Sequence, residues 1–184
     1  EVGAISVKGL TPKGRHGNPG TRIAETPSGV LNCIGLENPG AEHFVRKILP
    51  DLEKYDVPLL ANMSAGTVEE FAWMAETLSV DGIAGLEVNV SCPNVACEGM
   101  AFGIDPKVVE QVTKAVRKVT DKPVIVKLSP NVTDIVEIAK AVEAGGGDGV
   151  SLINTILGMA IDIHRRKPVL GNIYGGLSGP AVKP

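Results

Sequence analysis

Apolar residues occur in short runs that alternate between two periodicities along the chain. Some runs place apolar residues at consecutive positions over a few residues, which is typical of strands in a covered parallel sheet. The predicted strands span residues 3–7, 58–61, 86–90, 123–128 and 149–153. Between them, apolar residues recur at helical spacing. The pattern therefore predicts an α/β protein in which strands and helices alternate.

The predicted helices begin at recognisable capping residues. These caps are Asn38 with Pro39, Thr67 with Glu70, Asp105 with Pro106, and Asp134 with Glu137. A short polar side chain satisfies free backbone N–H groups at a helix start, and proline is tolerated in the first turn. We expect Pro50 to kink or divide the first of these helices, and the last to end at Gly145 and Gly146.

Two segments rich in glycine do not follow this alternation. Residues 9–29 contain too many Gly, Pro and Thr residues for a helix and are expected to form loops or short hairpins. Residues 175–180 predict a glycine-rich turn that enters a helix near residue 181, and backbone amides at such a turn can receive phosphate. The chain lacks an initial Met and ends in this predicted helix, so we expect a piece of a longer protein.

Polar residues gather where successive predicted strands end. They are Lys8, Asn62, Asn89 with Cys92, Lys127, and Asn154 with Thr155. No G-x-G-x-x-G follows the first strand, which disfavours a dinucleotide-binding Rossmann fold. In a (β/α)₈ barrel the strand ends converge on one ring, whereas in an open sheet they spread along an edge. We therefore favour an incomplete TIM barrel, since a full one has eight strands.

Composition narrows the class of protein further. The chain has 184 residues, 43% of them hydrophobic, and a net charge of −3 with scattered basic residues, so we expect neither a nucleic-acid nor a membrane surface. No apolar run approaches the length of a membrane span. The three cysteines are Cys33, Cys92 and Cys97, whose spacing predicts no metal site and indicates a reducing, cytoplasmic compartment.

The strongest candidate for chemistry is residues 87–95, where a predicted strand ends with Cys92 between Asn89 and Asn94. A thiol can take a proton, and amides can hold a planar ligand through donor and acceptor edges. Alternatively, Cys92 is a small buried hydrophobic residue. Lysines at the ends of core strands, Lys8 and Lys127, suggest a bound anion or an electron-rich ring, because burying an ammonium is costly. They could instead extend to the rim.

Three asparagines at one structural level, Asn62, Asn89 and Asn154, suggest a hydrogen-bonding frame for a ligand. Asn32 lies in the early loop region and could fold over the same opening. Seven segments, in order, then resemble the dihydroorotate dehydrogenase family, class 1, and most closely its NAD-dependent class 1B catalytic subunit. The segments are residues 8–9, 17–27, 31–40, 89–94, 126–131, 153–155 and 175–180.

The resemblance implies a single partial FMN-binding TIM-barrel domain over residues 1–184, from about strand 2 to the start of helix 6. It implies oxidation of dihydroorotate to orotate in pyrimidine biosynthesis, with Cys92 as the base. The implied cofactor-binding residues are Lys8, Gly9, Asn62, Asn89, Lys127, Ile153 and Gly179. The implied substrate-binding residues are Lys8, Asn32, Cys33, Ile34, Gly35, Leu36, Asn89, Asn94, Asn154 and Thr155. The side chains of Cys33 and Cys97 are expected to be structural.

Class 1B further implies a homodimeric core with a second subunit that carries FAD and a 2Fe–2S cluster and reduces NAD, giving a heterotetramer. Three alternatives stay open: a fumarate-using class 1A enzyme, a flavin barrel similar to dihydropyrimidine dehydrogenase, and a non-catalytic fragment. The family's first barrel strand and last two strands are absent from this sequence. We therefore expect the 184 residues alone to bind FMN weakly.

Overall fold

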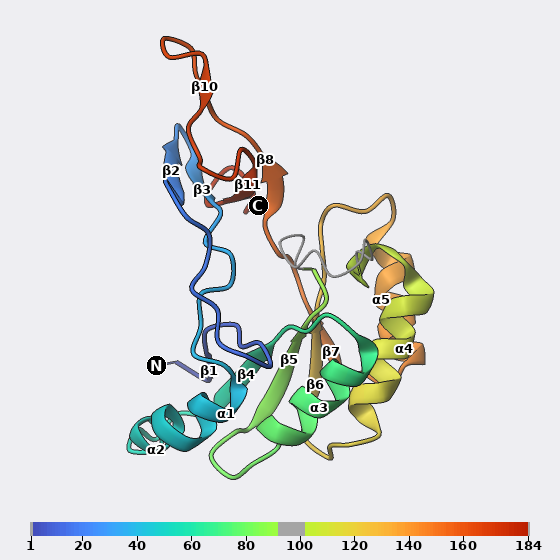
Figure 1. The fold of residues 1–184 in the computed structure, drawn as a ribbon. Helices are drawn as coiled ribbons and strands as arrows, with labels where there is room; N and C mark the ends of the chain where they lie inside the picture. Colours follow the sequence, from blue (N-terminus) through green and yellow to red (C-terminus); the bar gives the residue numbers. More distant parts are fainter. Residues whose placement is uncertain (1, 92–101, 184) are drawn as a thin grey trace.

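A computed structural model describes residues 2–91 and 102–183, so Cys92, Asn94 and Cys97 lie outside the described residues. Its centre is a parallel sheet of five strands within that part of the chain (Figure 1). These strands are β1 (Ile5–Ser6), β4 (Leu59–Met63), β5 (Gly85–Asn89), β6 (Val124–Lys127) and β7 (Gly149–Ser151). Each corresponds to a predicted strand.

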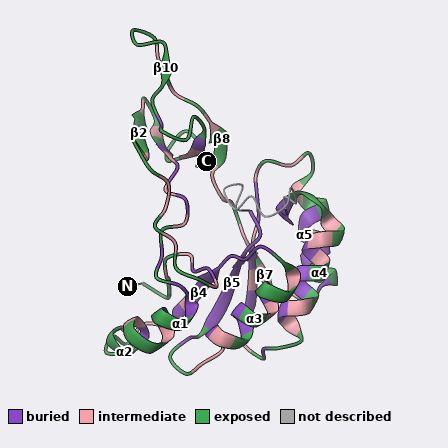
Figure 2. Cartoon of the chain, viewed as in Figure 1, coloured by how far each residue is buried: buried purple, intermediate pink, exposed green. Residues whose placement is uncertain are grey.

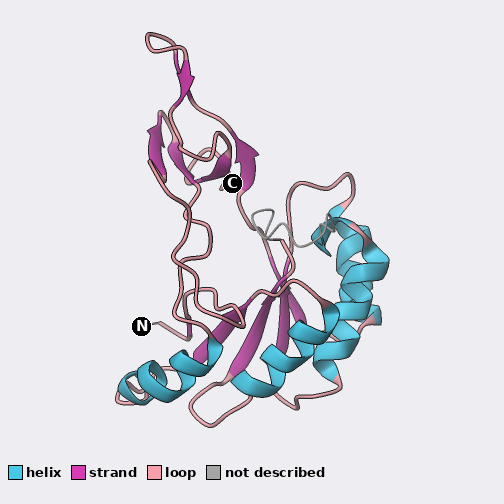
Figure 3. Cartoon of the chain, in the orientation of Figure 1, coloured by secondary structure: helices cyan, strands magenta, loops and turns pink. Residues whose placement is uncertain are grey.

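The order of the strands distinguishes a barrel from a doubly wound sheet. The order is β1-β4-β5-β6-β7, which follows the chain without reversal. Because parallel crossovers are right-handed, a sheet that grows in one direction places all its helices on one face. The sheet curls and the helices cover its outer face (Figure 3). This arrangement is a half-barrel, consistent with the predicted partial TIM barrel.

Three helices on the outer face begin at the predicted caps. They are α3 (Val68–Leu78), α4 (Pro106–Arg117), which follows the short 3₁₀ turn η2 (Phe102–Ile104), and α5 (Ile135–Ala144). Thr67 accepts the backbone N–H of Glu70 at 3.1 Å, and Asp105 and Asp134 accept N–H groups of their own first turns at 2.9 and 2.8 Å. Glu70 in turn accepts the N–H of Gly66 at 2.8 Å.

The predicted cap at Asn38 is wrong. The helical segment begins at α1 (Ala41–His43), and its cap is Gly40, which makes no side-chain hydrogen bond. Asn38 lies two residues earlier and holds the neighbouring loops. The π-helix η1 (Phe44–Ile48) and α2 (Leu49–Leu52) follow, with Pro50 in the first turn of α2. The predicted division at Pro50 is therefore confirmed.

A second, antiparallel sheet stands apart from the parallel one (Figure 1). It contains β2 (Ile23–Thr26), β3 (Gly29–Asn32), β11 (Gly175–Ser178) and β8 (Ile156–Gly158), in that order, and a small hairpin of β9 (Ile161–Asp162) and β10 (Lys167–Pro168) extends from it. The β2–β3 hairpin confirms the expectation for residues 9–29.

The prediction for residues 175–180 is wrong. This glycine-rich segment is mainly a strand, β11, and the chain beyond it forms a turn, with the N–H of Val182 donating to the carbonyl of Gly179 at 2.9 Å. Gly175 and Gly176 suit a strand that approaches its neighbours closely. A Cβ on Gly175 would lie 2.6 Å from the carbonyl oxygen of Asn32. The phosphate-binding turn expected here therefore has no support.

The main hydrophobic core lies between the parallel sheet and its helices (Figure 2). Val88 and Val126 point outward from their strands into this core, together with Phe71 and Leu78 of α3 and Val112 of α4. A smaller cluster of Ala24, Leu31, Cys33 and Leu170 holds the antiparallel sheet together. Within the described residues, no helix is long and apolar enough to cross a membrane.

Candidate functional site

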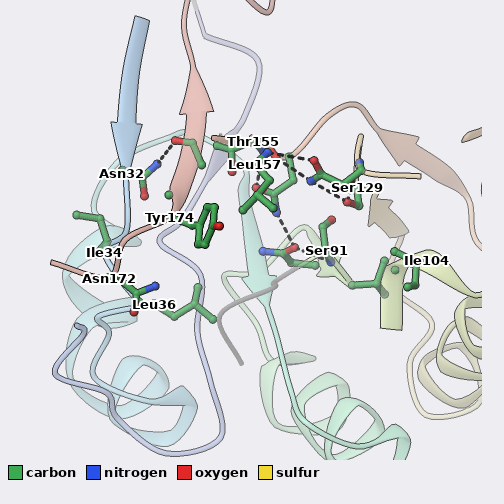
Figure 4. Close-up of a pocket in the computed structure, with 18 of the residues that line it drawn as sticks. Asn32, Ile34, Leu36, Ser91, Ile104, Ser129, Thr155, Leu157, Asn172 and Tyr174 are labelled. Atoms are coloured by element: carbon green, nitrogen blue, oxygen red, sulfur yellow. Dashed lines mark hydrogen bonds between the residues drawn. The ribbon is translucent and has the colours of Figure 1, made fainter. Parts of the chain in front are cut away.

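A cavity of about 510 Å³ lies between the two sheets (Figure 4). One wall consists of residues that follow the carboxyl ends of the parallel strands, and the other comes from the antiparallel sheet and its loops. The lining includes eight of the predicted site residues: Lys8, Asn32, Ile34, Gly35, Leu36, Asn89, Asn154 and Thr155. Residues from both ends of the sequence therefore meet at one site, as a barrel mouth requires.

Two of the predicted asparagines contact each other on the barrel wall. Asn154 donates through Nδ2 to Oδ1 of Asn89 at 3.1 Å, and the N–H of Ser91 donates to the same oxygen at 3.1 Å. The backbone N–H of Thr155 donates to Oδ1 of Asn154 at 2.8 Å. The side-chain oxygen of Asn89 is therefore used within the protein. Its NH₂ group is the part that can donate a hydrogen bond to a ligand.

The opposite wall is formed by β3 and the loop that follows it. Asn32 donates to the carbonyl of Gly176 on β11 at 3.4 Å, which holds it over the cavity. Gly35 and Leu36 both have positive φ, 77° and 53°, so the loop turns sharply. Asn38 accepts from the N–H groups of Thr11 and Gly40 and donates to the carbonyl of Leu36. The buried side-chain amide of Asn38 thus holds this loop in place.

Several residues of the lining were not predicted from the sequence. Ser129, Asn131, Asn172 and Tyr174 contribute polar groups, and the ring of Tyr174 stands between the two walls (Figure 4). Asn131 donates to the carbonyl of Thr155 at 3.2 Å and accepts the N–H of Leu157 at 3.0 Å, which ties the end of β6 to β8. Ser129 and Asn131 lie just after the end of β6. The search for polar residues at strand ends, which identified Lys127, could therefore have found them.

Comparison with known proteins identifies the family. The family model described as dihydroorotate dehydrogenase matches residues 1–184. The chain belongs to the dihydroorotate dehydrogenase family. Its sequence is 58% identical over 184 residues to a protein of Thermoanaerobacter sp. (strain X514), and 54% identical to proteins of Alkaliphilus metalliredigens (184 residues) and Enterococcus faecalis (186 residues).

Each of these relatives is named "Dihydroorotate dehydrogenase B (NAD(+)), catalytic subunit". The matches cover 100% of this chain and 60 to 61% of the relatives. The chain therefore spans about three-fifths of the length of these dihydroorotate dehydrogenase subunits. Within the described residues, no group of three or more His, Cys, Asp or Glu side chains could hold a metal ion.

A buried carboxylate, Glu87, lies inside the half-barrel and was missed from the sequence. It accepts hydrogen bonds from Asn62 Nδ2 at 2.5 Å, Ser6 Oγ at 2.9 Å and Ser151 Oγ at 2.8 Å. Burial alone would raise the pKa of Glu87, but these hydrogen bonds and the charge of Lys127 outweigh it and lower the pKa. The carboxylate is therefore ionised at neutral pH. The sequence could have indicated this position, because Glu87 lies two residues before Asn89 and alternate residues of a strand point to the same face.

Asn62 lies behind the cavity wall rather than on it. Its side chain is buried, and its Oδ1 has no hydrogen-bond partner among the described residues. Gly9 lies directly beside this oxygen, because a Cβ on Gly9 would lie 2.9 Å from it. An unpaired buried acceptor is rare and costs about 1 to 3 kcal/mol. A hydrogen-bond donor on a cofactor would satisfy it, so these residues fit the flavin that the family implies.

The two predicted lysines differ in their exposure to solvent. Lys8 is exposed and Lys127 is half-buried, so neither ammonium carries the full cost of burial. Lys8 still lines the cavity, and Lys127 lies near enough to Glu87 to lower its pKa. Lys8 can therefore face a ligand in the cavity while it stays hydrated, whereas Lys127 lies outside the cavity lining, beside Glu87.

Six predicted site residues in the described part of the chain lie outside the cavity lining: Gly9, Asn62, Lys127, Cys33, Ile153 and Gly179. Cys33, predicted as a substrate contact, is instead fully buried in the core of the antiparallel sheet, where its thiol donates to the carbonyl of Thr21 at 3.6 Å and its own carbonyl accepts from Asn18. Ile153 follows β7 and precedes Asn154. Gly179 ends β11 with φ 114°, and a Cβ there would lie 2.8 Å from Cα of Gly29. Gly179 is thus held close to the start of β3.

Proposed function

We propose that this chain is a single partial FMN-binding barrel domain, from about strand 2 to the start of helix 6, of a catalytic subunit that oxidises (S)-dihydroorotate to orotate in pyrimidine biosynthesis. One observation carries the proposal. Amides and a lysine that follow different strands converge on one cavity, in a chain that matches the dihydroorotate dehydrogenase family over residues 1–184.

The cavity offers the groups that a dihydroorotate molecule requires. Its carboxylate would pair with the ammonium of Lys8, and the exposure of Lys8 lets this pair form without the cost of burying a lone cation. The ring carbonyl and N–H groups would meet the amides of Asn32, Asn89 and Asn154. Thr155 and the backbone of residues 34–36, which line the cavity, would complete the frame. The oxygen of Asn89 already accepts from Ser91 and Asn154, and its NH₂ group has no partner among the described residues, so this NH₂ group is the part of Asn89 that would donate to the substrate.

The remaining polar residues would hold FMN. When bound, FMN supplies the hydride acceptor. Gly9 lies beside the unpaired oxygen of Asn62, which would accept a hydrogen bond from the cofactor, and the half-buried cation of Lys127 would stabilise negative charge on an electron-rich ring. Lys8 and Asn89 would contact both cofactor and substrate. Ile153 and Gly179 would contribute backbone contacts.

The base is proposed to be Cys92, which would remove the proton from C5 of dihydroorotate, with Asn94 as a further substrate contact. Both lie outside the described residues. A thiol has an ordinary pKa of about 8.5, which is close enough to neutrality for base catalysis once neighbours adjust it. The strand leading to this position ends at Asn89 on the cavity wall.

The names of the relatives support a partner subunit, since each is called a catalytic subunit and is linked to NAD(+). We propose a homodimeric core that passes electrons to a second subunit carrying FAD and a 2Fe–2S cluster, and then to NAD, in the cytoplasm. Fumarate reduction by the complete enzyme without NAD reduction would contradict this part of the proposal.

Replacing Cys92 by alanine in the full-length protein tests the function. We expect the rate of dihydroorotate oxidation to fall by about 10² to 10⁴, while FMN binding is retained. Cys97→Ala is the matched control, since no role is assigned to Cys97. An unchanged rate in Cys92→Ala would refute the base, and oxidation of dihydrouracil but not dihydroorotate by the parent enzyme would refute the substrate.

A further inference from the structure

The inside of the half-barrel contains a hydrogen-bonded cluster that the reaction itself does not use. Glu87 lies at the centre of this cluster. It belongs to β5, which lies between β4 and β6 in the sheet (Figure 1). One carboxylate oxygen accepts from Ser6 and Asn62 and the other accepts from Ser151, so the cluster joins β1, β4 and β7 to β5. Burying a carboxylate costs free energy, and a packed hydrophobic residue would join these strands equally well.

The chemistry of this cluster fixes the orientation of Asn62. An ionised carboxylate can only accept hydrogen bonds, so it can contact the NH₂ group of Asn62 and not its oxygen. The amide oxygen must then point away from Glu87. It is buried, has no partner among the described residues, and lies beside Gly9. A Cβ on Gly9 would also lie 3.3 Å from Cδ2 of Leu36, a residue of the cavity wall.

We propose that Glu87 is a positioning residue of the flavin site: it holds the NH₂ group of Asn62 so that the Asn62 oxygen accepts a hydrogen bond from a ring N–H of the flavin. This inference rests on the proposed function, and adds to it which atom of Asn62 meets the ligand and what selects that atom. The oxidised isoalloxazine ring carries a single ring N–H, that of its imide, so this group is the donor. Glu87 acts through Asn62 and does not itself touch the reacting atoms.

A reversal of the pair tests the proposal in the full-length protein with its partner subunit. Asn62→Asp places two carboxylates in contact, and we expect FMN to bind about tenfold more weakly or worse, the factor for about one lost hydrogen bond. Adding Glu87→Gln lets the glutamine NH₂ donate to one oxygen of the new carboxylate, while the second oxygen of that carboxylate still faces the ligand. We expect the double variant to bind FMN within about threefold of the parent protein, because the pair is restored with reversed polarity.

The measurement is the dissociation constant of FMN from the stripped protein, followed by flavin fluorescence. Glu70→Gln is the matched control, because it removes a carboxylate that accepts one backbone N–H outside the cavity. A double variant that binds FMN no more tightly than Asn62→Asp alone would overturn the proposal, since reversing the pair would then restore nothing. Equal binding of FMN by the parent protein and by Asn62→Asp would also overturn it.

A second measurement needs no variant and covers the case in which the double variant does not fold. The parent protein should bind FMN methylated at the imide nitrogen at least about tenfold more weakly than FMN, because the donor is lost. Equal affinity for the two would overturn the proposal. Failure of the proposed function is distinguishable, since the unmodified protein would then neither retain FMN nor oxidise dihydroorotate.

Discussion

The loop that carries Gly35 and Leu36 depends on one buried side chain, Asn38, and its removal gives a sharp prediction. Asn38 Oδ1 accepts the N–H groups of Thr11 and Gly40 at 3.1 and 2.8 Å. Its Nδ2 donates to Thr11 Oγ1 and to the Leu36 carbonyl at 2.8 and 2.6 Å. All four hydrogen-bonding positions of the amide are thus used, and only 8% of the residue is exposed.

Asn38→Ala removes these four hydrogen bonds together. At about 1 kcal/mol each, we expect the free energy of unfolding to fall by about 3 to 4 kcal/mol. With a urea dependence of about 2 kcal/mol per molar, the unfolding midpoint would fall by about 1.5 to 2 M. The control is Asn18→Ala, which removes one side-chain hydrogen bond, to the Cys33 carbonyl at 3.0 Å, and should cost about 1 kcal/mol. A loss in Asn38→Ala no greater than that in Asn18→Ala would refute the reasoning.

Two further predictions concern Glu87 and a helix cap. Because the pKa of Glu87 is lower in the folded state, its ionised form stabilises the fold above its unfolded pKa of about 4.3, and this stability is lost as pH falls through the folded value. The difference in unfolding free energy between the parent and Glu87→Gln should therefore shrink below about pH 4, and a constant difference would contradict it. Thr67→Ala should lower stability by about 1 kcal/mol through loss of the α3 cap, whereas exposed Thr133→Ala, the control, should change it by less than about 0.5 kcal/mol.

Features determined by neighbouring residues could be predicted from the sequence. Thr67, Asp105 and Asp134 cap helices because each needs only an N–H two or three residues further along the chain. The order of the parallel strands also followed, because alternation with helices leaves few possible topologies. The convergence of Lys8, Asn89 and Asn154 on one cavity is a consequence of that topology.

Features that depend on distant residues could not be predicted in this way. Residues 175–178 form a strand because β3, more than 140 residues earlier, supplies its hydrogen-bonding edge, and nothing in the local glycine-rich sequence indicates this pairing. Asn38 resembled a cap because Pro39 follows it, yet its partner Thr11 lies 27 residues away. Tyr174 enters the site through the same antiparallel sheet, so it was missed together with that strand.

The asparagines of this chain separate into structural and functional groups by how many of their hydrogen bonds the protein satisfies. Asn38 uses both atoms of its amide within the protein, so it can only support the loop. Asn89 uses its oxygen, and Asn62 uses its NH₂ group, while the other half of each amide has no partner among the described residues. The two unused halves are of opposite polarity. A ligand that satisfies both must therefore present an acceptor to Asn89 and a donor to Asn62, a requirement that ring carbonyl and imide groups meet and that a purely anionic ligand does not.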